Sequence, residues 1–334
     1  MTELIGIEIG DNLFLGSLLV SFITLFLLLI IIPKYLSSFF GECVANDKSS
    51  KFHHSMLRGL GILYPIILIL SSFFFGSFFT DFEIIIITLS TIVGFWDDKF
   101  GLMQKSKLII FLLIGFIWSL SQVNILIIDF ETVLKVLIFI FIFTFLVLFF
   151  NQIDGINGLA TITFLISIIF VQLYGLNLML FLPLFLSVLV YFFINLNGRI
   201  GIQGDAGSFF MGSFMAILFT KSIELSKIGI IFFILGALVF DVTATTLIRI
   251  YHRVDLTIGH RNNLYQKLVA KYQNHIKITF LFGFLQALLI YFIFIFLKQE
   301  NLFLFYLILF CLGGLFLLLF LVLAYSIHTN KILK

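Results

Sequence analysis

Charged residues are scarce in this sequence, where Asp, Glu, Lys and Arg make up 11% of 334 residues. Proline occurs three times, and the two cysteines are Cys43 and Cys311. Charge this low excludes an ordinary soluble domain, in which about a quarter of the residues are charged. The cysteines lie far apart without metal-ligand spacing, so neither a disulfide framework nor a zinc site is indicated. The net charge of +3 comes from dispersed basic residues, which argues against a nucleic-acid partner.

Apolar residues dominate instead. They make up 61% of the chain, and the mean hydropathy is +1.21. A helix needs about 20 mostly apolar residues to cross the hydrocarbon core of a bilayer. Apolar runs of this kind recur here with short polar breaks, so we predict an all-α, polytopic integral membrane protein with about 11 transmembrane helices. The predicted spans are 13–33, 60–79, 84–96, 108–122, 136–150, 158–174, 178–196, 208–222, 228–250, 276–297 and 302–325.

The distribution of basic residues predicts the orientation in the membrane. The run 13–33 lacks a small-residue cleavage pattern, so we expect it to stay as the first span rather than be removed as a signal peptide. With the N-terminus outside and the C-terminus cytoplasmic, most of the 20 lysines and arginines fall on the cytoplasmic side. We expect a single transmembrane domain over 1–334. Its cytoplasmic catalytic loops are predicted at about 34–59, 97–107, 151–157, 197–207 and 251–275.

Two adjacent carboxylates, Asp97 and Asp98, follow the predicted third span in the stretch GFWDDKFG. Adjacent carboxylates repel each other, and the C-terminal end of a helix disfavours further negative charge. Something positive should therefore lie nearby. One interpretation is a solvated helix end at which Lys99 supplies that charge. The other is a site for a hard cation such as Mg²⁺, which prefers oxygen ligands and shares them with substrate phosphates.

A second polar stretch, NQIDGINGLA, separates the predicted fifth and sixth spans. It fits a tight cytoplasmic turn in which Asn and Asp cap the following helix. It also fits a segment that reads a ligand, because Asn151, Asp154 and Asn157 recur at a spacing of three. If the segment is helical, one face carries all three side chains.

The third stretch, GDAGS, directly precedes an apolar run and contains Gly204, Asp205 and Ser208. Glycine lets the backbone approach an anion closely, and the start of a helix offers free N–H groups to phosphate. A plain turn with a helix cap would explain the glycines and the serine. It would not explain Asp205, for which we predict a functional role.

The last third of the chain adds an acid and a basic loop. Asp241 lies inside the apolar run 228–250, where it either faces a polar interior with a function or pairs with Arg249 two turns on. The loop that follows, YHRVDLTIGHRNNLYQKLVAKYQNH, is expected to be basic from its cytoplasmic side alone. Its HRNN cluster, with His260 and Arg261, is less generic because it offers several donors to phosphate or sugar.

Taken together, DD after the third span, NxxDGxNGLA after the fifth and GDxGS before the eighth resemble the polyprenyl-phosphate N-acetylhexosaminyl-1-phosphate transferase family, over about residues 13–275. Members of this family move a sugar-1-phosphate from a UDP-sugar to undecaprenyl phosphate and release UMP. The resemblance implies Mg²⁺, with Mn²⁺ as an alternative ion, bound by the catalytic residues Asp97, Asp98 and Asp205. The implied substrate-binding residues are Lys51, His53, Asn151, Asp154, Asn157, Gly204, Ser208, His260 and Arg261.

The chain departs from the family pattern at three places. Its first inner loop, KFHHSMLRGLG, keeps Lys51, His53 and Gly61 but lacks the family's prolines and one glycine. Asn157 stands where many bacterial members have Asp, which favours a hydrogen-bonding role over metal binding there. The late loop reads GHRNNLYQKL and is more similar to the O-antigen-initiating branch than to the histidine-rich peptidoglycan-precursor branch.

The resemblance therefore implies an enzyme of the bacterial inner membrane whose active site faces the cytoplasm and which initiates a cell-envelope polysaccharide such as O-antigen. Its partners would be UDP-N-acetylhexosamine, undecaprenyl phosphate and membrane lipid, with a homodimer left open. Lys51, His260 and Arg261 would balance phosphate charge. Asp97 would either deprotonate the lipid phosphate in a single displacement or form a covalent phospho-enzyme.

Two other functions compete with this one. An ion-coupled secondary transporter would favour carboxylates near the bilayer midplane and an inverted repeat. Only Asp241 approaches that depth, and the sequence has no evident repeat. A non-catalytic membrane scaffold gives no reason to place Asp97, Asp98, Asp154 and Asp205 at separate inner helix ends.

Overall fold

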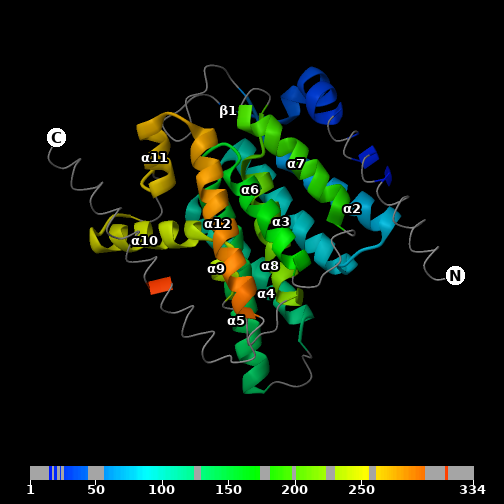
Figure 1. Ribbon diagram of the computed structural model, residues 1–334. Coiled ribbons are helices and arrows are strands. Elements are labelled where there is room, and N and C mark those ends of the chain that lie inside the picture. The colour runs from blue at the N-terminus through cyan, green and yellow to red at the C-terminus, as the bar shows by residue number, and fades with distance from the viewer. Residues whose placement is uncertain are drawn as a thin grey trace.

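The computed structural model describes residues 15–16, 19–20, 23, 26–43, 56–123, 129–173, 181–197, 201–222, 230–255, 261–297 and 313–314. Most of these residues are helical, and the main helices run side by side as a bundle (Figure 1). The α-helices are α2 (Leu63–Phe75), α3 (Asp81–Phe100), α4 (Gln104–Ser121), α5 (Phe130–Ile153), α6 (Leu159–Leu173), α7 (Leu182–Asn197), α8 (Gly204–Ser222), α9 (Ile230–Ile234), α10 (Ala237–Tyr251), α11 (Leu264–Tyr272) and α12 (His275–Leu297). A π-helical segment, Leu27–Leu36, and 3₁₀ turns at Ser37–Phe39 and Leu60–Ile62 precede α2.

A small three-stranded sheet at one end of the bundle was not predicted. It consists of β1 (Gly41–Cys43), β2 (Met56–Arg58) and β3 (Gly201–Ile202). Strand β1 pairs antiparallel with β2, and β2 pairs parallel with β3, so that Arg58 lies opposite Ile202. Apart from this sheet, the regular secondary structure of the described residues is helical. The sheet joins the first inner loop to the backbone just before α8.

Helix α8 lies at the centre of the bundle, and every side chain from Gly204 to Phe219 is buried. A helix that is apolar on all sides belongs inside a protein. Its neighbours approach closely where glycine removes the side chain. A Cβ atom at Gly212 would lie 2.4 Å from the Cα atom of Val147 on α5, so these two helices are in direct backbone contact.

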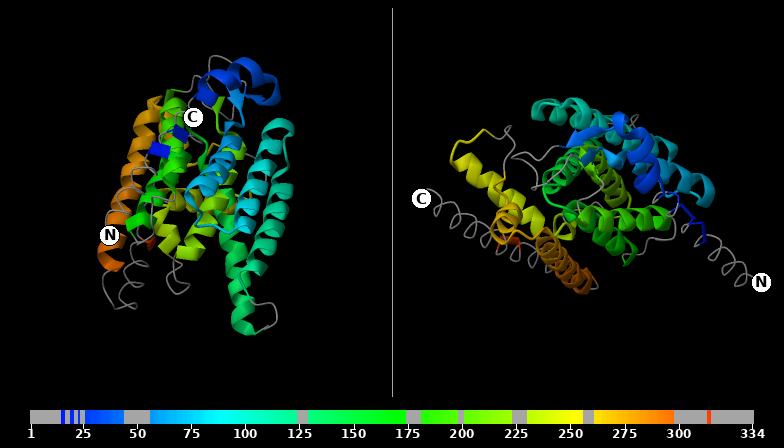
Figure 2. Two further views of the ribbon diagram at one scale, coloured as in Figure 1. Left: turned by 90° about the vertical axis from the view of Figure 1, so that its right-hand side faces the viewer. Right: turned by 90° about the horizontal axis from the view of Figure 1, so that it is seen from above.

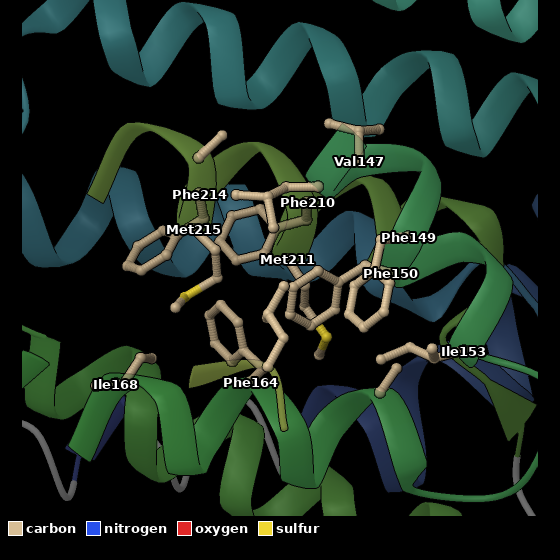
Figure 3. Packing of buried hydrophobic residues seen from close by; sticks show 14 of the residues in the cluster. Val147, Phe149, Phe150, Ile153, Phe164, Ile168, Phe210, Met211, Phe214 and Met215 are labelled. Atoms are coloured by element: carbon tan, nitrogen blue, oxygen red, sulfur yellow. The ribbon is translucent and has the colours of Figure 1, made fainter. Parts of the chain in front are cut away.

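Aromatic side chains fill the space between α5, α6 and α8 (Figure 3). The ring of Phe164 on α6 meets that of Phe214 on α8 at a centroid distance of 5.3 Å and an angle of 64°. Phe150 on α5 contacts Phe164 from the other side, edge to face, at 6.4 Å. Such pairs add to the stability from buried area and favour one packing arrangement. The position of α8, and hence of its first turn, is fixed by this packing.

Helix α3 is held at both ends. It begins with a capping box, in which Glu83 N–H donates to Thr80 Oγ1 at 3.3 Å and Thr80 N–H donates to Glu83 Oε2 at 2.9 Å. Lys221 near the end of α8 forms an ion pair with the buried Glu83 at 2.7 Å. The helix ends at Gly101, whose φ of 75° suits glycine. Its last turn therefore holds Asp97 and Asp98, as the sequence predicts.

The apolar helices of the structure are consistent with a chain embedded in a membrane. By length and composition, three helices of the described chain could cross a bilayer: α4, α5 and the portion His275–Ile293 of α12. Helices α2, α6 and α7 are apolar but shorter. Large apolar side chains such as Phe73, Ile85 and Trp96 are exposed on the outer faces, as lipid-facing residues are. The number of about 11 spans and the orientation stay predictions.

The predicted ninth span, 228–250, is broken. Helix α9 ends at Ile234, and α10 begins at Ala237 after Gly236, which has a φ of 70°. Helix α10 then runs across the direction of α12, as Figure 1 shows. Seen from above in Figure 2, one end of the yellow α10 lies beside the orange α12. Asp241 therefore belongs to a crosswise helix rather than to a continuous membrane span.

Candidate active site

Three carboxylates from two distant stretches meet at the sheet end of the bundle. Asp97 and Asp98 lie in the last turn of α3, and Asp205 lies in the first turn of α8. The two helices touch there because Gly94 carries no side chain. A Cβ atom at Gly94 would lie 2.4 Å from the carbonyl oxygen of Asp205. We call Asp97, Asp98 and Asp205 the acid cluster.

Two basic residues join these carboxylates. Arg58 of β2 donates from Nε to Asp98 Oδ1 at 2.6 Å and from Nη2 to Asp205 Oδ1 at 3.1 Å. Lys107 of α4 donates from Nζ to Asp205 Oδ2 at 2.8 Å and also contacts Oδ2 of Asp97. The carboxylate of Asp205 thus lies between both cations. The positive charge expected beside the DD pair is present, and Arg58 and Lys107 supply it.

Sequence reasoning missed Arg58 and Lys107 as site residues. Both were read only as basic residues that mark the cytoplasmic side. The signal that could have found them is the demand for positive charge next to Asp97 and Asp98, together with two basic positions in the neighbouring loops. The strand β2 positions Arg58, and the turn between α3 and α4 positions Lys107. The sequence does not specify either element, so it does not identify which basic residues pair with the acids.

Asp98 is the most enclosed member of the acid cluster, with a side chain of 0% exposure. Its Oδ1 accepts the backbone N–H of Asp205 at 2.8 Å, and its Oδ2 accepts that of Ala206 at 3.0 Å. Gly204, with a φ of 69°, allows this approach, since a Cβ atom there would lie 2.3 Å from Asp98 Oδ2. The first N–H groups of α8 were predicted to be free for phosphate. They bind Asp98 instead, which caps the helix.

The NQIDGINGLA stretch reaches the acid cluster through α8. Helix α5 ends at Ile153, so Asn151 is in its last turn and Asp154 and Asn157 follow in a turn. The three residues therefore do not share one helical face. Asn151 Nδ2 donates to Ser208 Oγ at 3.3 Å, and Ser208 Oγ donates to the carbonyl oxygen of Asp205 at 3.2 Å.

Asp154 is linked to the segment before α8 by Gln203. Gln203 Nε2 donates to Asp154 Oδ1 at 2.9 Å, while Gln203 Oε1 accepts from Tyr64 Oη at 3.3 Å and from Thr161 Oγ1 at 3.4 Å. Burial raises the pKa of Asp154 well above its usual value, and the charges of Asp205 and Asp98 raise it further. Gln203 is a third residue of this region that sequence reasoning missed, after Arg58 and Lys107.

Of the remaining predicted residues, Asn157 and Arg261 are described and three others are not. Asn157 is held by α12, because its backbone N–H donates to His275 Nδ1 at 3.4 Å and its carbonyl oxygen accepts from Thr279 Oγ1 at 2.8 Å. Arg261 is exposed in the segment directly before α11. Lys51, His53 and His260 lie outside the described residues.

The acid cluster suits a divalent cation that arrives with a substrate. Among the described residues, no three acidic, histidine or cysteine side chains form a closed metal cage. Asp97 and Asp205 share Lys107 and lie close together, and Mg²⁺ commonly uses one or two carboxylates and completes its shell with water and substrate phosphates. Three carboxylates against two cations also leave a formal charge of −1. Donor type and charge therefore fit the ion.

Comparison with known proteins gives the same family as the motifs. The family model described as glycosyl transferase family 4 matches residues 82–223, a range that contains all three members of the acid cluster. A Bacillus subtilis (strain 168) protein described as a probable undecaprenyl-phosphate N-acetylglucosaminyl 1-phosphate transferase is 26% identical over 302 residues, which cover 80% of this chain and 82% of that protein. Both comparisons support the polyprenyl-phosphate sugar-1-phosphate transferase family that the motifs resemble. The chain holds these motifs at one end of a helical bundle, where the small sheet contributes Arg58.

Proposed function

We propose that this transferase moves an N-acetylhexosamine-1-phosphate from a UDP-sugar to undecaprenyl phosphate and releases UMP. The product would initiate a cell-envelope polysaccharide, of which O-antigen is one example. The description of the Bacillus subtilis relative supports the acceptor and the type of group transferred. The reaction would take place at the cytoplasmic face of the bacterial inner membrane, where a nucleotide sugar from water meets a lipid phosphate at the headgroups.

One observation carries this proposal, namely that the motif acids converge. Asp97 and Asp98 are about a hundred residues from Asp205, yet Asp98 Oδ1 accepts the N–H of Asp205 at 2.8 Å. The convergence occurs at the end of a bundle whose outer faces are apolar. This convergence supports a site at which charged phosphates and a membrane-bound substrate would meet.

The proposed reaction joins a phosphomonoester to a pyrophosphate. An oxygen of undecaprenyl phosphate attacks the β-phosphorus of the UDP-sugar, a new P–O bond forms, and the bond from the β-phosphorus to the bridging oxygen breaks as UMP leaves. Catalysis of such a step is mainly positioning and neutralisation of charge. Arg58 and Lys107 would face the phosphates as they approach the acid cluster, with Lys51, His53, His260 and Arg261 as further phosphate ligands.

Mg²⁺, or Mn²⁺ in its place, would polarise the pyrophosphate and offset its charge. Asp97 and Asp205 are the proposed ligands because their carboxylates share Lys107. Asp98 would support the same ion indirectly, by holding the start of α8 and hence Asp205 in position. Both of its oxygens already accept backbone N–H groups there. Asn151, Asp154 and Asn157 would contact the nucleotide, with Gly204 and Ser208 shaping the turn beside it.

The test is UMP release by the purified chain in detergent with undecaprenyl phosphate, Mg²⁺ and a panel of UDP-N-acetylhexosamines. We expect release with one sugar, loss of release on adding EDTA, and loss in Asp205→Asn. Asp129→Asn is the matched control, because Asp129 is an exposed helix cap of α5 that asparagine replaces well. Rapid mixing of the wild type with UDP-sugar in the absence of undecaprenyl phosphate, with Asp97→Asn alongside, would separate a single displacement from a phospho-enzyme. Only a phospho-enzyme releases UMP before the acceptor is added, and Asp97→Asn should abolish that release.

No UMP from folded protein with any sugar would contradict the transferase proposal. Release that persists in Asp205→Asn would contradict the assigned metal site alone. The transporter alternative is not favoured, because the intramembrane acid on which it relied, Asp241, binds backbone N–H groups of α11.

A further inference from the structure

Asp241 is fully buried and binds the start of another helix. Its Oδ1 accepts the backbone N–H of Leu264 at 2.7 Å, and its Oδ2 accepts that of Tyr265 at 3.1 Å. Leu264 and Tyr265 are the first two residues of α11. The first N–H groups of a helix have no partner within the helix, and a carboxylate is also favoured there by the helix dipole. Asp241 therefore caps α11 from a different helix, α10.

The break between α9 and α10 makes this contact possible. Gln286 of α12 donates from Nε2 to the carbonyl oxygen of Ile234 at 2.9 Å, which satisfies a backbone group freed where α9 ends. Gly236 lies directly against Gln286, since a Cβ atom there would be 2.8 Å from the Gln286 Cα atom. Helix α10 leaves this point crosswise and carries Asp241 toward α11 (Figure 1). A continuous span would have kept Asp241 on the line of α9.

Helix α11 in turn touches the NQIDGINGLA stretch. The hydroxyl of Tyr265 donates to the carbonyl oxygen of Gln152 at 2.7 Å, and the Tyr265 side chain is fully buried. A Cβ atom at Gly155 would lie 2.6 Å from Gln266 Nε2 and 2.8 Å from Tyr265 Oη. Two consecutive residues of α11 therefore pack against the turn that contains Asp154.

We infer that Asp241 is a positioning residue for the donor substrate. By capping α11, it holds the preceding residues 261–263 and the NQIDGINGLA turn against each other as one binding surface. This inference rests on the proposed function, in which Arg261 contacts phosphate and the turn contacts the nucleotide. Asp241 itself touches neither substrate nor metal in this arrangement, because both of its oxygens face α11. Tyr265 is the second positioning residue and transmits the effect to Gln152.

The experiment compares Asp241→Ala, Asp241→Asn and Tyr265→Phe in the full-length protein. Two readouts are needed: KM for each substrate, and the rate of trypsin cleavage within α11 at Lys267 and Lys271. Glu83→Gln is the matched control, since Glu83 is a buried acid in an ion pair at the opposite end of α3 from the acid cluster. The same protein without substrates is used for the trypsin measurement, so that result does not depend on the reaction.

We expect Asp241→Ala to raise KM for the UDP-sugar at least about tenfold, since two hydrogen bonds to a charged acceptor are lost, while KM for undecaprenyl phosphate changes by less than about twofold. Tyr265→Phe loses one neutral bond and should raise the donor KM about fivefold. Asp241→Asn keeps one acceptor oxygen and should be intermediate. Trypsin should cut α11 at least about tenfold faster in Asp241→Ala and at the wild-type rate in Glu83→Gln.

Equal changes in both KM values, or the same KM pattern in Glu83→Gln, would overturn the inference because they indicate general destabilisation. Unchanged cleavage in Asp241→Ala would overturn the capping role itself. Absence of turnover in the wild type, with α11 still cut faster in Asp241→Ala, would contradict the proposed function and leave the capping role supported.

Discussion

Replacing Asp98 by asparagine is expected to destabilise the protein as well as abolish its activity. The Asp98 carboxylate accepts two backbone N–H groups at the start of α8 and the Nε–H of Arg58 at 2.6 Å. The Asp98 side chain is 0% exposed. Asparagine offers one acceptor oxygen and presents an NH₂ group where the second acceptor was. One N–H of α8 would then face another donor.

The cost follows from these contacts. A bond to a charged group contributes about 1.5–3 kcal/mol, and a buried donor left unpaired costs about 1–3 kcal/mol, so the expected loss is about 3–5 kcal/mol. The Arg58 bond adds little to this sum because the Arg58 side chain is 34% exposed. At about 2–4 °C per kcal/mol, the relation for domains of some 150–250 residues, the midpoint of heat denaturation should fall by roughly 6–20 °C.

The assay is heat denaturation in detergent, followed by fluorescence and by the fraction of protein that stays monodisperse. Asp81→Asn is the control, because Asp81 lies in the exposed first turn of the same helix and its replacement should shift the midpoint little. An unchanged midpoint in Asp98→Asn together with lost activity would refute the capping role. Asp98 would then have to act directly on substrate or metal.

Two further predictions concern the same region. Gly94→Ala should lower both activity and the denaturation midpoint, because the new Cβ atom would lie 2.4 Å from the Asp205 carbonyl oxygen, whereas Gly115→Ala, with its nearest neighbour at 3.2 Å, should cost less. Burial raises the pKa of Asp154, so its contribution to stability is fully present below the ordinary value of 3.8 and is lost as pH rises through the higher folded pKa. Asp154→Asn should therefore gain stability relative to wild type as pH rises above 3.8, and a difference independent of pH would contradict this.

The family resemblance implied that Asp97, Asp98 and Asp205 form one site, and their positions at predicted helix ends placed all three on one side of the membrane. Asp97 and Asp98 follow one apolar run and Asp205 precedes another, so a bundle with those ends on one side brings them together. Being on one side does not by itself bring the acids into contact. They come into contact because Gly94 and Gly204 carry no side chain, which lets α3 and α8 approach closely. A glycine in an apolar run has several explanations, and only the packing of α3 on α8 selects the right one.

Other parts of the fold depend on contacts that no local pattern contains. The break at Gly236 is stabilised by Gln286, fifty residues later in the chain, and it turns an apolar run of span length into two helices. The cap of α11 by Asp241 follows from that break. Hydropathy measures how apolar a segment is. It does not indicate that a distant side-chain amide, here that of Gln286, replaces a missing helical hydrogen bond.

The balance of charge in the acid cluster bears on the order of binding. Asp97, Asp98 and Asp205 with Arg58 and Lys107 carry a formal charge of −1, which repels a pyrophosphate and a lipid phosphate alike. On the proposed function, a divalent cation would change that formal charge to +1 and would favour both phosphates. We therefore expect the metal to bind before the phosphates or together with the UDP-sugar. Without it, Arg58 and Lys107 would hold the carboxylates in place, and the remaining formal charge would disfavour both phosphates.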